Sequence, residues 1–200
     1  MIVTVTLNPA VDKVARLDKI KQHEVNRLTK VESDAGGKGI NVSRTIKTLH
    51  GYSIATGFLG GSGGNFIDCL LQREEIDSHM IHIIGNTRSN LKIVDDENQM
   101  SEFNEEGPFI LQNEQDELFD YLRINLDQEC VLVISGSMPK GMSRSTYYNL
   151  IEMAKEKYKN YLYIEIMPEE SKNAVFYEKH GFQRMNDGVA MQLCNFSNQY

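Results

Sequence analysis

The feature that most constrains the fold is a glycine-rich turn that runs directly into a helical pattern. The turn places three glycines and a lysine in four residues, and an apolar face at helical spacing follows: Gly36, Gly37, Lys38 and Gly39, then Val42, Ile46 and Leu49. Glycine lets backbone N–H groups approach a ligand closely, and a helix N-terminus favours an anion. The stretch therefore predicts either a site for an anionic small molecule or a tight turn that binds nothing.

Apolar runs alternate with helical patterns along the first three quarters of the chain. We expect strands near 2–7, 52–58, 80–84 and 130–134, and helices near 40–49, 65–73, 114–125 and 143–157. The run at 130–134 is the most apolar and is typical of a central strand buried on both faces. This order predicts an α/β, doubly wound fold. Polar groups after the strands would then gather at one sheet edge: Asp12, the Gly36 turn and the turn at 135–141.

Two other regions alternate between polar and apolar residues. Residues 13–33 predict two exposed strands, and 90–94 with 100–104 predict a hairpin around an acidic turn. Each region has one apolar face, so together they predict a small β-sheet beside the main domain. A second glycine cluster, 60–64, is either a flexible turn or a further binding element.

Composition excludes several classes of function. The formal net charge is −7, which argues against a general nucleic-acid binder. No apolar run approaches the roughly 18 residues of a membrane span. The three cysteines form no CxxC pair or Cys/His cluster, so neither a disulfide framework nor a metal site is expected. The start has no basic region of the kind a signal peptide carries, and we expect a cytoplasmic protein.

Six segments, in order, resemble the PfkB branch of the ribokinase-like sugar kinases, and within it the 1-phosphofructokinase and tagatose-6-phosphate kinase group. The segments are 4–12, 35–44, 57–61, 87–93, 103–108 and 135–141. The resemblance runs from residue 1 to about 157. It implies a ribokinase-like doubly wound sheet, truncated, with residues near 13–33 and 88–105 forming the family's β-sheet lid.

The resemblance also implies a site for a phosphorylated ketohexose, such as fructose 1-phosphate or tagatose 6-phosphate. Asp12 would bind sugar hydroxyls, and Gly36, Gly37 and Asn41 would line the sugar pocket. Lys38 and Arg88 would face the phosphate already on the substrate, and Ser137 would lie near the active centre. Taken alone, Asp12 is equally explained as a turn or cap residue, and Arg88 as an exposed loop arginine.

The family transfers the ATP γ-phosphoryl group with the help of Mg²⁺ and an aspartate base. That base belongs to a late Gly-Ala-Gly-Asp type motif, which this sequence lacks. Asp187-Gly188 has no glycine turn before it, so no catalytic residue is assigned. ATP and Mg²⁺ are therefore implied by the family alone, and catalysis is expected to be impaired.

The remaining residues, 158–200, have a different character. Residues from about 165 to 194 resemble the C-terminal end of a GNAT-type N-acetyltransferase, in which Asn173 and Tyr177 would contact acetyl-CoA and protonate its thiolate. Read without that family, 169–180 predicts a helix that Gly181 ends, followed by a pair of short strands. A natural fusion, a designed chimera and a misjoined reading frame would each produce such a sequence.

Three functions remain open at this point. The first is ATP-dependent phosphorylation of a ketohexose phosphate, and the second is sugar-phosphate binding without catalysis. The third, an N-acetyltransferase, lacks the expected cofactor-binding glycine turn. A truncated sheet would also leave the strand at 131–134 at an edge, so we expect marginal stability and self-association through the lid or through this edge.

Overall fold

The computed structural model describes residues 1–127, 129–157, 163–166, 175, 178–179, 181–184 and 191–194. The chain divides into two compact units, Met1–Ile151 and Glu152–Tyr200. No helix among the described residues is both long and apolar enough to cross a membrane.

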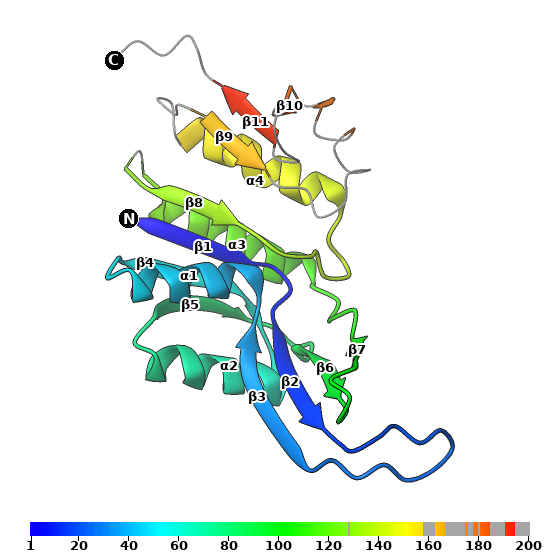
Figure 1. Ribbon diagram of the computed structural model, residues 1–200. Helices are drawn as coiled ribbons and strands as arrows, with labels where there is room; N and C mark the ends of the chain where they lie inside the picture. The colour runs from blue at the N-terminus through cyan, green and yellow to red at the C-terminus, as the bar shows by residue number, and fades with distance from the viewer. Residues whose placement is uncertain are drawn as a thin grey trace. The chain divides into compact units, whose positions relative to one another are not determined.

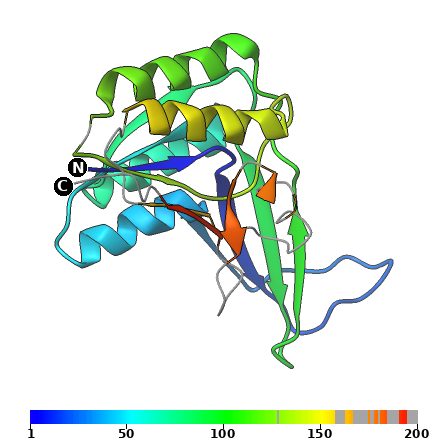
Figure 2. The ribbon, with the colours of Figure 1, turned by 90° about the horizontal axis from the view of Figure 1, so that it is seen from above.

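The first unit is built on a parallel four-stranded sheet in the order β5-β4-β1-β8. Its strands are β1 (Ile2–Thr6), β4 (Ser53–Leu59), β5 (Asp77–His82) and β8 (Val131–Ile134), and its helices are α1 (Lys38–Thr48), α2 (Gly61–Arg73) and α3 (Gln112–Asn125). Figure 2 shows α1 and α3 on opposite sides of β1. Helices on both faces of a parallel sheet make the doubly wound α/β architecture that the element order predicts.

A second sheet extends from the first, with its outer loop at one end of the unit (Figure 1). Its order is β3-β2-β6-β7, formed by β2 (Ala10–Arg16), β3 (Lys30–Gly36), β6 (Arg88–Val94) and β7 (Met100–Asn104). β2 pairs with β6 in parallel, and the two outer pairs are antiparallel. The predicted pair of exposed strands and the predicted hairpin therefore join in one sheet, which we call the lid.

The lid and the main sheet share one apolar core. Val11 is 6% exposed and Ala35 is 2% exposed, and both pack with residues of α1, α2 and the main sheet. The cluster comprises Val11, Ala35, Ile40, Ala55, Leu59, Ile67, Leu71, Ile76 and Met80. Because successive side chains of a strand alternate between faces, burying Val11 turns Asp12 toward the opposite face of the lid.

Three sequence interpretations change in the structure. The strand at 131–134 lies at the edge of the described sheet and its Val131 is exposed, so the interpretation of a central strand buried on both faces is wrong. The second glycine cluster is no flexible turn, because Gly61–Gly64 form the first turn of α2. Asp12 lies within β2, two residues after the lid begins, and it is neither a turn nor a cap residue.

The second unit contains a three-stranded antiparallel sheet in the order β10-β11-β9. Its strands are β9 (Tyr163–Ile166), β10 (Gln183–Arg184) and β11 (Met191–Cys194), which confirms the predicted pair of closing strands. Gly181 has a φ of +87°, and its N–H donates to the Glu178 carbonyl, as expected of a residue that ends a helix. Asn173, Tyr177 and most of the predicted helix at 169–180 lie outside the described residues. In the sequence, α4 (Arg144–Lys157) follows β8 and precedes β9.

One arginine joins α1 to two other elements of the first unit. Arg44 donates to both carboxylate oxygens of Glu74, at 2.7 and 2.6 Å, to Asp34 at 2.8 Å, and to the Ala35 carbonyl at 2.9 Å. The hydrogen bond from Arg44 holds the pKa of Asp34 below its usual value. These bonds connect α1, the end of α2 and β3. The Arg44 side chain is only 22% exposed, so the bonds are partly shielded from water.

Replacing Arg44 by methionine should therefore destabilise the first unit. We expect Arg44→Met to lower the free energy of unfolding by about 2 kcal/mol, because two carboxylates lose charged donors. The matched control is Lys47→Met on the same helix, whose pair with Glu75 is exposed and should contribute less than about 1 kcal/mol. Urea denaturation measures both variants, and equal losses would contradict the role of Arg44.

Candidate functional site

The candidate site lies where β1 and β8 end. The chain leaves β1 toward β4 on one side, whereas β8 enters on the other side of β1, so the direction of winding reverses between them. Open α/β sheets bind ligands at such a reversal, beyond the carboxyl ends of the strands. The lid begins at the same edge, because residues 7–9 are all that separates β1 from β2.

Asp12 lies between the glycine turn and the lid strand β6. Asp12 and Asn90 are register partners, and the Asn90 amide donates to Asp12 Oδ1 at 2.8 Å. A methyl group placed on Gly36 would come 2.5 Å from the Asp12 carboxylate, so glycine is what allows this approach. The structure thus brings together Asp12 and Gly36, and adds Asn90, which the sequence analysis did not single out.

The N-terminus of α1 follows directly at Gly37. Thr6 Oγ1 accepts a hydrogen bond from the Ile40 N–H at 3.0 Å, so the end of β1 satisfies one of the first amides of the helix. Lys38 and Asn41 are exposed on the first turn. A methyl group placed on Gly136 would lie 4.0 Å from Lys38 Cβ, which puts the turn after β8 next to the start of α1.

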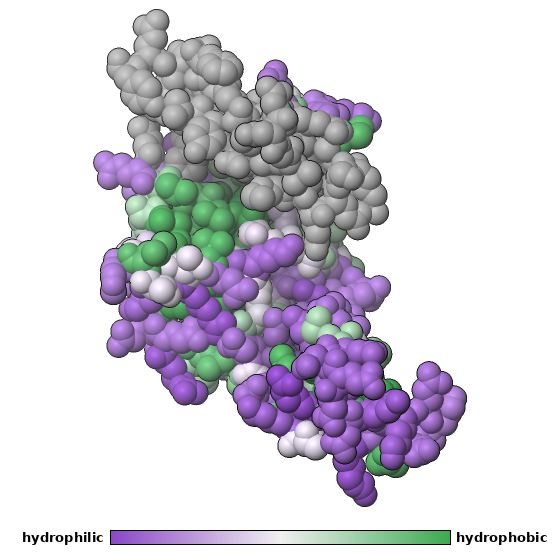
Figure 3. Space-filling view, in the orientation of Figure 1, coloured by the Kyte–Doolittle hydropathy of each residue, from purple (hydrophilic) through white to green (hydrophobic). Residues whose placement is uncertain are grey.

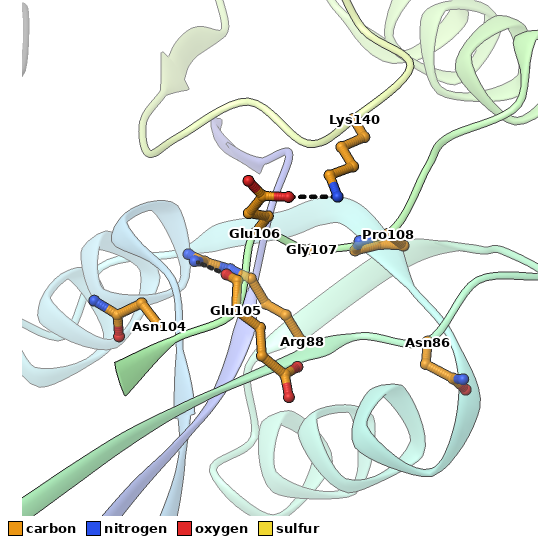
Figure 4. Close-up of a pocket in the computed structure, with 8 residues that line it drawn as sticks. All are labelled: Asn86, Arg88, Asn104, Glu105, Glu106, Gly107, Pro108 and Lys140. Atoms are coloured by element: carbon orange, nitrogen blue, oxygen red, sulfur yellow. Dashed lines mark hydrogen bonds and ion pairs between the residues drawn. The ribbon is translucent and has the colours of Figure 1, made fainter. Parts of the chain in front are cut away.

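A cavity of about 440 Å³ opens beside the lid (Figure 4). It is lined by Asn86, Arg88, Asn104, Glu105, Glu106, Gly107, Pro108 and Lys140. Arg88 donates to the Glu105 carbonyl at 2.9 Å, and Lys140 forms an ion pair with Glu106. The hydrogen bond from Lys140 also lowers the pKa of Glu106. Two cations from different elements therefore border one cavity.

Strand register relates this cavity to Asp12. Arg88 and Asn90 are two residues apart in β6, so their side chains emerge on the same face of the lid. Asn90 has two register partners, Asp12 in β2 and Asn104 in β7. The carboxylate, two amides and the guanidinium consequently share one face of the lid. Such a face can bind a ligand that carries both hydroxyl groups and an anion.

Not all of the predicted residues line this cavity. Arg88 does, whereas the other six are absent from its lining residues: Asp12, Gly36, Gly37, Lys38, Asn41 and Ser137. Ser137 Oγ instead accepts a hydrogen bond from the Asn8 amide at 3.3 Å. The residues that sequence reasoning missed are Asn8, Asn90, Glu105, Glu106 and Lys140. All five lie in the quoted motif segments, where the charges of Glu106 and Lys140 were a usable signal.

The described residues offer no cluster of ligating side chains for Mg²⁺. No group of three or more His, Cys, Asp or Glu side chains among them could hold a metal ion. In the cavity, Glu106 is paired with Lys140, and the remaining polar groups include the Arg88 guanidinium. Mg²⁺ prefers carboxylate and water oxygens, so we derive no step through ATP or Mg²⁺ from these residues.

The contact of Gly36 with Asp12 can be tested by a double-mutant cycle. We expect Gly36→Ala to lower the free energy of unfolding by about 1–3 kcal/mol, because the added methyl group overlaps the Asp12 carboxylate. In an Asp12→Ala background the cost should fall below about 1 kcal/mol, since the three nearest atoms all belong to Asp12. Chemical denaturation of the four proteins measures both costs. The same cost in both backgrounds would show that the two residues do not touch.

Comparison with known proteins places the chain in a family. A family model described as "pfkB family carbohydrate kinase" matches residues 5–180. The match extends beyond residue 157, while the division at 157 and the GNAT-like interpretation of 158–200 stay predictions. Tagatose-6-phosphate kinase of Staphylococcus epidermidis is 38% identical over 157 residues, which are 78% of this chain and 50% of that protein. The chain thus spans about half the length of the curated relatives it matches.

Solved structures agree with this assignment. Phosphofructokinase-2 from Escherichia coli, in complex with fructose-6-phosphate, is 29% identical with a TM-score of 0.73, over 78% of this chain and 52% of that one. The tetrameric inhibited form of the same enzyme is 28% identical, with a TM-score of 0.73 and the same coverage of both chains. The predicted ribokinase-like α/β fold is confirmed by these structures. Because the family model covers most of the sequence, this chain belongs to the pfkB family of carbohydrate kinases.

Proposed function

We propose that the chain binds a phosphorylated ketohexose on the face of the lid that carries Asp12 and Arg88. The observation that carries this proposal is the shared face, where the Arg88 guanidinium and the Asp12–Asn90 pair are two residues apart along the strands. A sugar phosphate needs a cation for its phosphate and oxygen or amide groups for its hydroxyls. The exposed Lys140 supplies a second cation at the cavity.

The family relationship supports this substrate class. The relative at 38% identity is a tagatose-6-phosphate kinase, and one structural neighbour was solved with fructose-6-phosphate. Fructose 1-phosphate and tagatose 6-phosphate are therefore the ligands to test first. In this proposal Gly36, Gly37 and Asn41 border the sugar, Lys38 and Arg88 face its phosphate, and Ser137 lies near the reacting hydroxyl.

The family's reaction is ATP-dependent phosphorylation, typically with Mg²⁺. We propose that these 200 residues carry the sugar side of that reaction without completing it, because they contain no Gly-Ala-Gly-Asp motif to supply the base. Sugar-phosphate binding without catalysis is then the function of the chain by itself. A coupled assay of ADP release, with either sugar phosphate and MgATP, decides between binding without catalysis and phosphorylation. Turnover above background would favour the kinase.

Removing the guanidinium of Arg88 should selectively weaken binding of the phosphorylated sugar. We expect Arg88→Ala to lower the affinity for fructose 1-phosphate or tagatose 6-phosphate about 10- to 100-fold, since a charge-assisted bond to phosphate is lost. Binding of unphosphorylated fructose should change little. Titration calorimetry measures both ligands, with Arg123→Ala on the exposed face of α3 as the matched control. Equal losses for both sugars, or the same loss in the control, would refute the assignment.

We also propose that the protein self-associates. Two exposed apolar regions are available, the lid strand β7 with Phe103 at 57% exposure and the β8 edge with Val131 at 55%. The space-filling view shows mostly hydrophilic surface over the lid and an apolar patch beside the main sheet (Figure 3). Charged residues on strand edges block pairing. Sedimentation velocity of Phe103→Lys and Val131→Lys should show which variant becomes monomeric, and a monomeric unmodified chain would end the proposal.

A further inference from the structure

One buried side chain connects the three segments that surround the candidate site. Asn8 follows β1 and is 5% exposed. Its amide nitrogen donates to the Glu106 carbonyl at 3.0 Å and to Ser137 Oγ at 3.3 Å. These partners lie in the segment after β7 and in the segment after β8. A single amide therefore links the end of β1 to both.

The same residue also contacts Arg88, through its backbone. Arg88 Nε donates to the Asn8 carbonyl oxygen at 3.3 Å, while Arg88 Nη1 donates to the Glu105 carbonyl at 2.9 Å. Both acceptors belong to segments that the Asn8 side chain holds together. The guanidinium thus bonds two carbonyls, and the Asn8 amide adds a bond between the segments that carry them.

The surroundings are shaped to accept asparagine. Gly107 has a φ of +100°, and a methyl group placed there would overlap Asn8 Oδ1. Asn8 Oδ1 is buried and has no hydrogen-bond partner among the described residues. A buried polar atom without a partner costs free energy, which the two bonds of the amide nitrogen offset. The two bonds made by the amide nitrogen are the polar contacts that this side chain makes among the described residues.

We propose that Asn8 is a positioning residue that holds Arg88 toward the phosphate of the bound sugar. The inference rests on the proposed function of the site, and Asn8 itself does not touch the ligand. Without its amide, the segments at 105–107 and 135–137 are no longer connected to the end of β1 through this side chain. The backbone bond from Ile110 to Lys140, at 2.9 Å, would still join those two segments to each other. Removing the Asn8 amide therefore affects the link between these segments and the end of β1, where the Asn8 carbonyl accepts a hydrogen bond from Arg88.

Hydrogen exchange tests this link without any ligand. The Glu105 amide donates to the Ser89 carbonyl and the Ser135 amide to the Val5 carbonyl, both at 3.2 Å, so both are protected in the unmodified chain. Asn8→Ala should raise the exchange rates of these two amides about tenfold or more, because the segments open locally. Asn8→Ser, which keeps a small polar group, serves if the alanine variant does not fold. Unchanged rates at both amides would overturn the proposal.

The matched control is Ser43→Ala, on α1, whose hydroxyl contacts Thr4 in the middle of β1. Ser43 is fully buried and bonds Thr4 Oγ1 at 2.7 Å and Ser53 Oγ at 3.1 Å, so its loss also removes buried hydrogen bonds. It should lower stability comparably while leaving the amides of Glu105 and Ser135 protected. If Ser43→Ala accelerates the same two amides equally, general destabilisation explains the effect and the proposal fails.

Binding of fructose 1-phosphate or tagatose 6-phosphate provides a second readout. Asn8→Ala should weaken binding about tenfold in the unmodified background, and by less than about twofold in Arg88→Ala, since the side chain acts through Arg88. Additive losses would show that Asn8 does not act through Arg88. If the unmodified chain binds neither sugar, the proposed function fails, and the exchange rates alone decide whether Asn8 positions the segments.

Discussion

The parallel pairing of β1 with both β4 and β8 is the constraint on which the site depends. β1 continues into the lid through residues 7–9, and β8 ends next to it. Val3 and Val5 are almost fully buried, so the strand cannot shift its register without exposing them. A fixed register at β1 gives Thr6, Asn8 and Asp12 defined positions relative to the sheet edge. Each of these residues then contacts a different segment of the site.

The lid is positioned by the same strand and stabilised by the same core. Val11 packs into the cluster formed with α2, and the next residue, Asp12, consequently faces the other way. Arg44 adds a polar connection between β3, α1 and the end of α2. The inner end of the lid is therefore anchored to the main domain, while its outer loop, 17–29, is largely exposed. Such an arrangement keeps Asp12 and Arg88 fixed relative to the sheet edge.

The charges at the site come from segments that are far apart in the sequence. Arg88 begins β6, Glu106 follows β7 and Lys140 follows β8. The family resemblance implies that Lys38 and Arg88 both face the phosphate of the substrate. The structure adds Lys140 to the cavity that Arg88 lines, and it places Lys38 on the exposed first turn of α1 near Gly136. Motif position alone identifies the sheet edge at which a charge lies, but not which charges share a cavity.

Local patterns in the sequence determined the order of strands and helices, the lid and the glycine turn before α1. Alternation of polar and apolar residues and the stop signals of glycine act over a few residues, so they can be read without the fold. The pairing partner of each strand cannot be read in this way, because it depends on which strands meet in the folded chain. Only the tertiary structure decided that β8 pairs with β1, that Asp12 sits in a lid strand opposite Asn90, and that Asn8 joins three segments. Those relations follow from register and from crossing connections, in which residues more than 75 positions apart come into contact.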